Sequence, residues 1–571
     1  MIFFWVPDTL GVVPIFVNAG TALLPTLIAL ASSFAAMLLR PTDLWSACRS
    51  RPWIPAGIVT FGLMCVFVYG WLMSPANENA SIQREPMSSS VTLQRDWTRY
   101  ALKLIEQEER ATLLGPTSTH VSHNGGNALD LALATTGVQS APTSQATTLR
   151  RPVIFRGGPE RTGVMSGPGP LKLAPFWEYK EENEMYCASP CVANGRVFGT
   201  SILLDPPKSF GTVFCLDEST GEKKWLTHLK DGNSKQEFKG IFSSPALSGD
   251  GKYLVVGQGL HSDAGCELIC LDAHTGRIHW LVKTPLHIEG SPAIEGDIAV
   301  AGAGAIEVGE DHKPRGDANG VGHPGMVIGV RISDGRELFR YPVPDPESSP
   351  VVEGGVAYIG SGLNGNAVYA LRTAPDEELK AKNLERLVWR VPAPFPASGP
   401  VTLAGELVLV GCGKGDFVFA DPNPEGLLLA IDRATGKERF RVALPDAVLG
   451  AIAVRDGIAI CPIRNGEVFA IDLRKADGNR ILWRTAVNGS AAVLAGTAFT
   501  GSLVYAVSQD GYMAILDARD GTQLERVFVN GKGKPGEMGL SVSAPVLSNG
   551  RVFLGSETGG LRCYIGKESR P

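Results

Sequence analysis

Apolar and polar positions alternate in short runs along the C-terminal part of the chain, and small turn residues separate the runs. One unit opens with the apolar phrase SPAL (244–247), turns at GDGK (249–252) and continues into YLVVGQG (253–259). Alternating runs of about four to eight residues, joined by glycine-rich turns, predict antiparallel β-strands rather than helices. The chain from residue 151 to residue 571 is therefore predicted to be an all-β domain.

The phrase Asp-x-x-Thr-Gly-x-x-x-Trp/Phe recurs within these runs. It is complete in FCLDESTGEKKW (214–225), ICLDAHTGRIHW (269–280) and LAIDRATGKERF (429–440). Looser copies stand at residues 328–339, 469–483 and 514–524. A repeat of about 50 residues that holds four short strands is typical of a β-propeller blade.

The number of blades follows from the phrases that open each first strand. Eight such phrases occur, and they begin at residues 189, 244, 291, 349, 399, 450, 490 and 543. Only seven fourth strands follow them, because the chain stops after LRCYIGKESRP. The missing strand is predicted in PFWEYK (175–180), where it would complete the last blade and remove exposed sheet edges. The predicted fold class is an eight-bladed β-propeller, with Trp177 in the same sheet as residues 562–565.

Two kinds of side chain within the phrase are predicted to be structural. The aromatic residues are expected to dock blades against one another: Trp177, Trp225, Trp280, Trp389 and Trp483. The residue before the "LD" pair is nearly always small, and this favours a position where a blade packs closely on its neighbour. These residues are Cys215, Cys270, Gly329, Ala370, Ala430, Ala470 and Cys563, whereas the seventh blade has Ile515.

Two long uncharged segments precede the propeller. Residues 9–39 and 52–73 carry no charged side chain, and each exceeds the roughly 20 residues that a helix needs to cross a bilayer. The loop between them, residues 40–51, contains three arginines, and no lysine or arginine precedes it. The positive-inside rule places this loop in the cytoplasm and the propeller on the extracytoplasmic, periplasmic side of an inner membrane. A signal peptide is the alternative, but it needs a basic start and one short apolar stretch.

Residues 74–150 are predicted to be a linker. Residues 95–114 form one possible amphipathic helix within it, with Trp97, Ala101, Leu104 and Ile105 along a single stripe. The flanking segments are rich in Ser, Thr, Gly and Ala, which is typical of a tether. We expect no functional site in this part of the chain.

Composition excludes several functions. The net charge of −5 over 571 residues gives no argument for nucleic-acid binding. The ten cysteines contain no CxxC, no CxxCH and no adjacent pair, so they match no common metal or redox motif.

The Asp-x-x-Thr-Gly-x-x-x-Trp phrase, the Ser-Pro openings and the count of eight blades resemble the pyrroloquinoline-quinone (PQQ) repeat β-propellers, over roughly residues 176–566. That superfamily includes quinoprotein alcohol dehydrogenases and the non-enzymatic BamB-type subunit of outer-membrane protein assembly. The quinoprotein enzymes of this superfamily hold the quinone with a vicinal disulfide and a Ca²⁺ ion and use a catalytic Asp. The resemblance implies that this chain would need the same groups if it were such an enzyme. No adjacent cysteines occur here, and no motif places the calcium ligands or the Asp. We therefore predict a BamB-like binding or scaffold module without catalysis; a PQQ-dependent dehydrogenase with PQQ and calcium is the alternative.

The loops between second and third strands are unusually long in several blades. They are GLHSDAGCE at 259–267 and longer segments at 200–211, 304–325 and 411–426. Equivalent loops of a propeller emerge on one face, so this face is predicted to contact a protein partner or a metal. The opposite face has one long connection, residues 372–386. The candidate binding residues are His261, Asp263, Asp311, His312, Asp317 and His323, and the alternative is that they are solvated loop residues.

Overall fold

The computed structural model describes two separate parts of the chain. They comprise residues 2–4, 13–15, 153, 155–165, 167–205, 208–229, 239–260, 264–304, 325–362, 365–415, 417, 420–476, 478–530 and 542–569. The chain divides into two compact units, Met1–Met87 and Ser88–Pro571, and each is treated by itself.

The described residues of the first unit form a two-stranded antiparallel sheet, β1 (Ile2–Phe4) with β2 (Val13–Ile15). β2 lies inside the predicted membrane helix at 9–39, and for these three residues that prediction is wrong. Pro14 has no amide hydrogen for a helical bond, and it pairs with Phe3 in the sheet. The rest of 9–39, the segment 52–73 and the predicted helix at 95–114 lie outside the described residues. Among the helices that the structure does describe, none is long and apolar enough to span a membrane.

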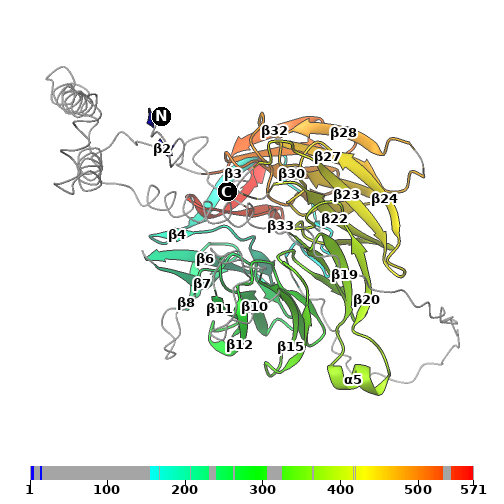
Figure 1. Cartoon of the computed structure of the whole chain (residues 1–571). Helices are drawn as coiled ribbons and strands as arrows, with labels where there is room; N and C mark the ends of the chain where they lie inside the picture. Colours follow the sequence, from blue (N-terminus) through cyan, green and yellow to red (C-terminus); the bar gives the residue numbers. More distant parts are fainter. Residues whose placement is uncertain are drawn as a thin grey trace, which may run out of the picture. The chain divides into compact units, whose positions relative to one another are not determined.

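The second unit forms eight blades around a common centre (Figure 1). Each is an antiparallel sheet of four strands, and blade 1 has a fifth. Blade 1 contains β4 (Glu184–Met185), β5 (Cys191–Ala193), β6 (Arg196–Asp205), β7 (Lys208–Asp217) and β8 (Lys223–His228). Blade 2 contains β9 (Ala246–Leu247), β10 (Tyr253–Gly257), β11 (Ala264–Asp272) and β12 (Ile278–Leu286). Blade 3 contains β13 (Ala293–Glu295), β14 (Ile298–Ala303), β15 (Met326–Arg331) and β16 (Glu337–Pro342).

The next three blades follow the same plan. Blade 4 contains β17 (Val351–Glu353), β18 (Val356–Ser361), β19 (Ala367–Arg372) and β20 (Leu387–Pro392), with helix α5 (Asp376–Ala381) between its last two strands. Blade 5 contains β21 (Thr402–Ala404), β22 (Leu407–Gly413), β23 (Gly426–Asp432) and β24 (Glu438–Leu444). Blade 6 contains β25 (Ala453–Arg455), β26 (Ile458–Pro462), β27 (Glu467–Asp472) and β28 (Ile481–Ala486).

The last two blades include the closure of the ring. Blade 7 contains β29 (Ala498–Thr500), β30 (Leu503–Val507), β31 (Tyr512–Asp517) and β32 (Gln523–Phe528). Blade 8 contains β33 (Val546–Ser548), β34 (Arg551–Ser556), β35 (Gly560–Gly566) and, as its outermost strand, β3 (Leu173–Tyr179); the short η2 (Lys567–Ser569) follows. Trp177 pairs with Cys563, and Glu178 accepts a 2.8 Å bond from Arg562. The predicted closure of an eight-bladed ring is therefore confirmed.

Hydrogen bonds between the Ser-Pro phrases show that the first strands begin side by side. The N–H of Ser189 donates to Oγ of Ser244 at 3.0 Å, Ser244 donates in turn to Ser291 at 3.0 Å, and Ser291 donates to Ser349 at 2.9 Å. The N–H of Ala544 in blade 8 donates to Oγ of Ser189 at 2.7 Å. The serine of the phrase thus links each of these blades to the next.

This arrangement gives the ring two different faces. The first strands begin at one face, where the second strands also end and the third strands begin, as β10 and β11 do; we call it the loop face. The turns between third and fourth strands, such as residues 218–222, lie on the opposite face, the turn face. Because neighbouring strands run in opposite directions in every blade, the same division into two faces holds for all blades.

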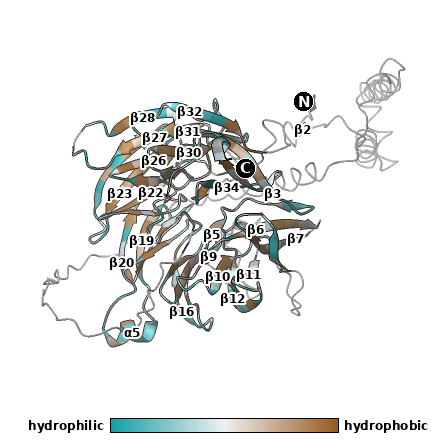
Figure 2. Cartoon of the chain, turned by 180° about the vertical axis from the view of Figure 1, so that it is seen from behind, coloured by the Kyte–Doolittle hydropathy of each residue, from teal (hydrophilic) through white to brown (hydrophobic). Residues whose placement is uncertain are grey.

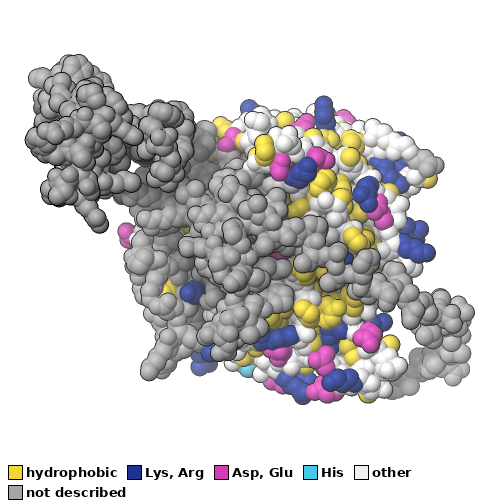
Figure 3. Space-filling view, in the orientation of Figure 1, with side chains coloured by type: hydrophobic (Ala, Val, Ile, Leu, Met, Phe, Trp, Pro, Cys, Tyr) yellow, Lys and Arg dark blue, Asp and Glu magenta, His cyan; other side chains and the backbone are white. Residues whose placement is uncertain are grey.

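The core lies between the blades. Third strands such as β23 and β35 are buried along their whole length, because both of their faces pack on neighbouring sheets. Outermost strands such as β24 alternate between exposed and covered positions. Figure 2 shows the inner strands β22, β26 and β30 as mainly hydrophobic, and α5 as hydrophilic. On the face drawn in Figure 3, acidic and basic side chains are intermixed.

Candidate functional site

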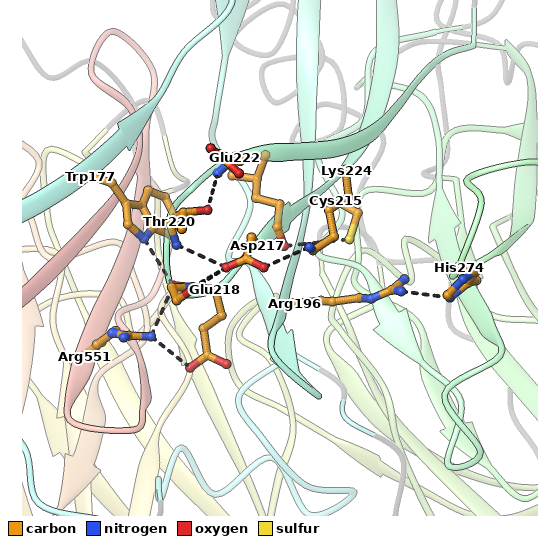
Figure 4. Close-up of polar contacts among 12 residues, drawn as sticks. Trp177, Arg196, Cys215, Asp217, Glu218, Thr220, Glu222, Lys224, His274 and Arg551 are labelled. Carbon is orange, nitrogen blue, oxygen red and sulfur yellow. Dashed lines mark hydrogen bonds and ion pairs between the residues drawn. The ribbon is translucent and has the colours of Figure 1, made fainter.

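The Asp-x-x-Thr-Gly phrase forms a capped turn on the turn face. In blade 1, Oδ1 of Asp217 accepts hydrogen bonds from the N–H groups of Ser219 (2.9 Å) and Thr220 (3.2 Å), and its other oxygen lies 2.8 Å from Lys224 (Figure 4). The bond from Lys224 and those from the turn lower the pKa of Asp217 far below its usual range. Gly221 then adopts a φ of +74°, which suits a residue without a Cβ.

The tryptophan of one blade contacts this turn in the next blade. The indole of Trp177 lies against Gly221, and its Nε1–H donates to the carbonyl oxygen of Glu218 at 3.2 Å (Figure 4). A Cβ on Gly221 would lie 2.7 Å from the indole, so only glycine permits this approach. The other four tryptophans make the same bond three residues before a glycine: Trp225 to Ala273 (3.2 Å), Trp280 to Ile332 (2.6 Å), Trp389 to Arg433 (3.0 Å) and Trp483 to Ala518 (3.0 Å).

Two blade boundaries use a different contact. Phe339 of blade 3 faces blade 4, where Cζ of Arg386 lies 4.0 Å from the centroid of the phenyl ring. Phe440 of blade 5 faces blade 6, where Cζ of Arg480 lies 3.7 Å from the centroid. A cation–π contact stands here in place of the indole and glycine.

The small residue before the "LD" pair lies directly opposite the aromatic residue of its own blade. Cys215 pairs with Trp225, and Gly329 pairs with Phe339, whose ring a Cβ at position 329 would overlap. In blade 7 the partner is Glu525, and here the bulky Ile515 is accepted. The close neighbour that selects a small side chain is therefore the aromatic across the strand pair, and not only the adjacent blade as the sequence indicated.

A segment that the sequence analysis did not single out crosses the centre of the ring. We call the described residues between 153 and 170 the axial strap. Its Val153 exchanges backbone hydrogen bonds with Leu247 of blade 2, at 3.1 and 2.8 Å. Further along, backbone carbonyls of the strap accept bonds from blades 5, 6 and 7: Glu160 from Leu403 (2.9 Å), Thr162 from Val454 (2.8 Å) and Gly163 from Phe499 (2.9 Å). The strap therefore joins the inner strands of blades that are far apart in the ring.

Two arginines of the strap are buried in this centre. Arg161 is 0% exposed, and its Nη2 donates to the carbonyl oxygens of Ser291 (2.8 Å) and Pro292 (3.0 Å) at the start of blade 3. Arg156 is 2% exposed, and its Nη2 donates to the carbonyl oxygen of Thr497. Burial lowers the pKa of both guanidinium groups to about 9, so both remain charged at neutral pH.

Buried polar side chains also lie at the bases of the loops on blades 2 to 4. Gln258 donates to Glu267 at 3.2 Å, and Nε2 of His287 lies 3.2 Å from Glu347. His287 is fully buried, and Glu267 is nearly so. These residues border the predicted contact loops at 259–267 and 304–325, and the sequence analysis named none of them.

Blade 8 contributes one buried acid to the loop face. Glu557 follows β34 and is 4% exposed, and its Oε1 has no hydrogen-bond partner. Burial raises the pKa of Glu557 to about 8. The thiol of Cys187 is also buried, and burial together with the charge of Glu557 raises its pKa well above the usual range. The eight cysteines in the described part of the chain are all buried, and none of them forms a disulfide there.

The predicted binding residues lie outside the described residues. They are His261, Asp263, Asp311, His312, Asp317 and His323. Within the described ranges, no three His, Cys, Asp or Glu side chains come together in a way that could hold a metal ion. No two cysteines are adjacent in the sequence, so the chain cannot form the vicinal disulfide that the resemblance implies for a quinone site.

Comparison with known proteins agrees with this architecture. The fold and its capped turns define the class, a PQQ-type repeat β-propeller. The model of the family described as outer membrane protein assembly factor BamB matches residues 176–385 and 375–569. Because the match covers more than half of the chain, the protein belongs to this PQQ-repeat β-propeller family.

Solved structures share the fold at low identity. BamB from Moraxella catarrhalis is 15% identical, with 69% of this chain and 99% of that chain covered and a TM-score of 0.49. Quinohemoprotein alcohol dehydrogenase from Comamonas testosteroni is 15% identical, with 73% and 81% covered and a TM-score of 0.51. The enzyme ADHIIG from Pseudomonas putida HK5 is 14% identical, with 73% and 80% covered and a TM-score of 0.52. No curated protein sequence matches the chain.

Proposed function

We propose that this protein is a membrane-anchored, extracytoplasmic propeller that binds a protein partner through its loop face and carries out no catalysis. In this proposal residues 9–39 and 52–73 are the anchor, with the loop 40–51 in the cytoplasm of a cell with an inner membrane. Residues 74–150 are the tether. The match to the BamB family model supports an assembly role of this kind.

The axial strap is the observation that carries the proposal. A small molecule can bind a closed propeller at two kinds of site, the centre of the ring and the outer loops. Here the chain's own residues bridge the centre from blade 2 to blades 5, 6 and 7. The long connections of the loop face remain as the binding surface, and the rigid blades hold them at fixed separations.

In this proposal the anchor and tether limit how far the binding surface can move from the membrane. A tether confines a binding surface near its anchor and raises its effective concentration toward partners in the same membrane. We therefore expect the partner to be a membrane protein or a protein held at the membrane.

The loop face is tested by replacing Asp263, Asp311, His312 and Asp317 together with Ala in the full chain. Exposed loop substitutions cost less than about 0.5 kcal/mol each, so folding is expected to survive while crosslinking to the partner in membranes is lost. The matched control replaces Glu377, Lys380 and Lys382 of the α5 connection on the turn face. Loss of crosslinking in the control alone would place binding on the turn face and contradict the proposal.

The topology is tested by a reporter fused to the C-terminus. A reporter that is active only after export is expected to be active there. Activity of a cytoplasmic reporter at the same position would reverse the proposed orientation.

A PQQ-dependent dehydrogenase is the second candidate. Glu557 favours it, because a buried carboxyl group with a pKa raised to about 8 is mostly protonated at neutral pH and is suited to donate a proton there. Adding PQQ and Ca²⁺ to the purified protein tests this candidate. Retained quinone absorbance together with alcohol-dependent dye reduction would favour the enzyme over the scaffold.

A further inference from the structure

The centre of the ring contains more positive charge than its described surroundings balance. Arg156 and Arg161 are both buried on the axial strap, and neither forms an ion pair with any described carboxylate. Burying a charge without a partner is strongly unfavourable, and buried charges in proteins are almost always paired. We propose that the centre of the ring binds one halide ion in contact with the guanidinium groups of Arg156 and Arg161.

The hydrogen bonds of the two arginines leave donors for such an ion. Each guanidinium is held by backbone carbonyls through Nη2 alone, and carbonyls carry no net charge. Nη1 of Arg156 and both Nε and Nη1 of Arg161 have no hydrogen-bond partner among the described residues. The charge of Arg156 also lowers the pKa of Arg161, so the two groups repel each other and one anion relieves both.

The surroundings select a small ion. Arg161 is 0% exposed, and apolar side chains surround the strap, with Phe155, Ala451 and Ala544 forming one buried cluster. The ring of Phe155 lies 5.4 Å from Cζ of Arg161. A site without solvent contact and with apolar walls admits a bare halide more readily than a hydrated oxyanion, and its low polarity strengthens the attraction.

Thermal unfolding of the full chain at constant ionic strength tests the proposal. Replacing gluconate by chloride or bromide is expected to raise the Tm by about 2 °C or more, because a ligand that binds only the folded state stabilises it. The variant Arg156→Met with Arg161→Met is expected to lose this response. The matched control is Arg386→Met, because Arg386 is also buried but is paired with Asp376 at 2.6 Å, and its response to halide should equal that of the wild type.

Three results would overturn the proposal. One is an equal wild-type Tm in gluconate and halide, another is a halide response that persists in the double variant, and the third is stabilisation by sulfate alone. If the double variant does not fold, crystals of the wild-type chain grown in bromide give a second measurement. An anomalous peak against the free nitrogens of Arg156 and Arg161 supports the site, and the absence of that peak rejects it.

Discussion

Seven of the eight blade boundaries in this ring are of two kinds; in blade 7, which faces blade 8, Glu525 occupies the position of the aromatic residue. At five boundaries an indole lies on a glycine and donates to a carbonyl three residues earlier, as Trp483 does with Gly521 and Ala518. At the boundaries of blades 3 with 4 and 5 with 6, a phenylalanine lies under an arginine, as Phe440 does under Arg480. The same position of the fourth strand therefore meets two different partners.

The length of the opposing connection explains the difference. Blades 1, 2, 3, 5 and 7 have the short turn that ends in glycine, which leaves an open surface and a carbonyl for the indole. Blades 4 and 6 have longer connections, at residues 373–386 and 473–480, and the one described glycine in them, Gly478, has nothing within 4 Å of a Cβ. An arginine from the end of the longer connection covers the ring instead. The docking contact is thus set jointly by the aromatic of one blade and the turn of the next.

Removing an indole should have the largest effect on stability. Trp483 is 8% exposed, so Trp483→Ala is expected to lower the free energy of unfolding by about 3–4 kcal/mol. Trp483→Phe should cost less but remain unfavourable, because the phenyl ring cannot donate to Ala518 and no arginine lies over it. Urea denaturation measures both. A Phe variant as stable as the wild type would mean that the two kinds of boundary are interchangeable.

Filling the glycine should have the next largest effect. Gly521 has a φ of +74°, and a Cβ there would lie 2.5 Å from the Trp483 ring, so Gly521→Ala is expected to cost about 2–3 kcal/mol. Gly501 is the matched control: its φ is +54° and nothing lies within 4 Å of a Cβ, so Gly501→Ala should cost about 1 kcal/mol from strain alone. Equal losses in the two variants would show that the indole contact adds nothing.

The cation–π boundary should show a smaller coupling. Arg480 also donates to backbone carbonyls of its own connection, so Arg480→Met alone measures more than one contact. A double-mutant cycle with Phe440→Leu isolates the pair, and a coupling energy of about 1 kcal/mol is expected. A coupling energy of zero would show that the cation–π contact contributes nothing and that this boundary is held by apolar packing.

The capped turns should make a small contribution that depends on pH. The hydrogen bond from Thr435 and the pairing with Arg439 lower the pKa of Asp432 to about 2. The unfolded carboxyl has a pKa of about 3.9, so the stabilisation is complete above that pH and disappears as the pH falls toward 2. Asp432→Asn keeps the acceptor oxygen but does not titrate, so its stability should change less than that of the wild type between about pH 4 and pH 2. Parallel acid titrations followed by fluorescence compare the two.

The repeat made the ring predictable from sequence. The spacing from Asp217 to Trp225 recurs often enough to count blades, and the lack of a last fourth strand pointed to Trp177. These signals are local, since each reflects one turn and the strand beside it. The reason for the small residue at Gly329 needed the register, which places Phe339 opposite it.

The centre of the ring was not predictable in the same way. The strap follows no repeat, and no motif in the sequence singles out Arg156 and Arg161. Their burial arises from contacts with residues 130 to 341 positions away. The contact of buried His287 with half-buried Glu347 likewise joins two blades, across 60 positions. No periodic pattern carries such information.

The closure by β3 has a consequence for how the protein is made. β3 is synthesised well before its partner β35, because the paired residues Glu178 and Arg562 are 384 positions apart. At about 5–20 residues per second, β3 waits roughly 20–80 s for its partner during synthesis. Throughout that time its edge is available to other strands. The growing chain therefore needs either a chaperone at this strand or a late, post-synthetic step in which the ring closes.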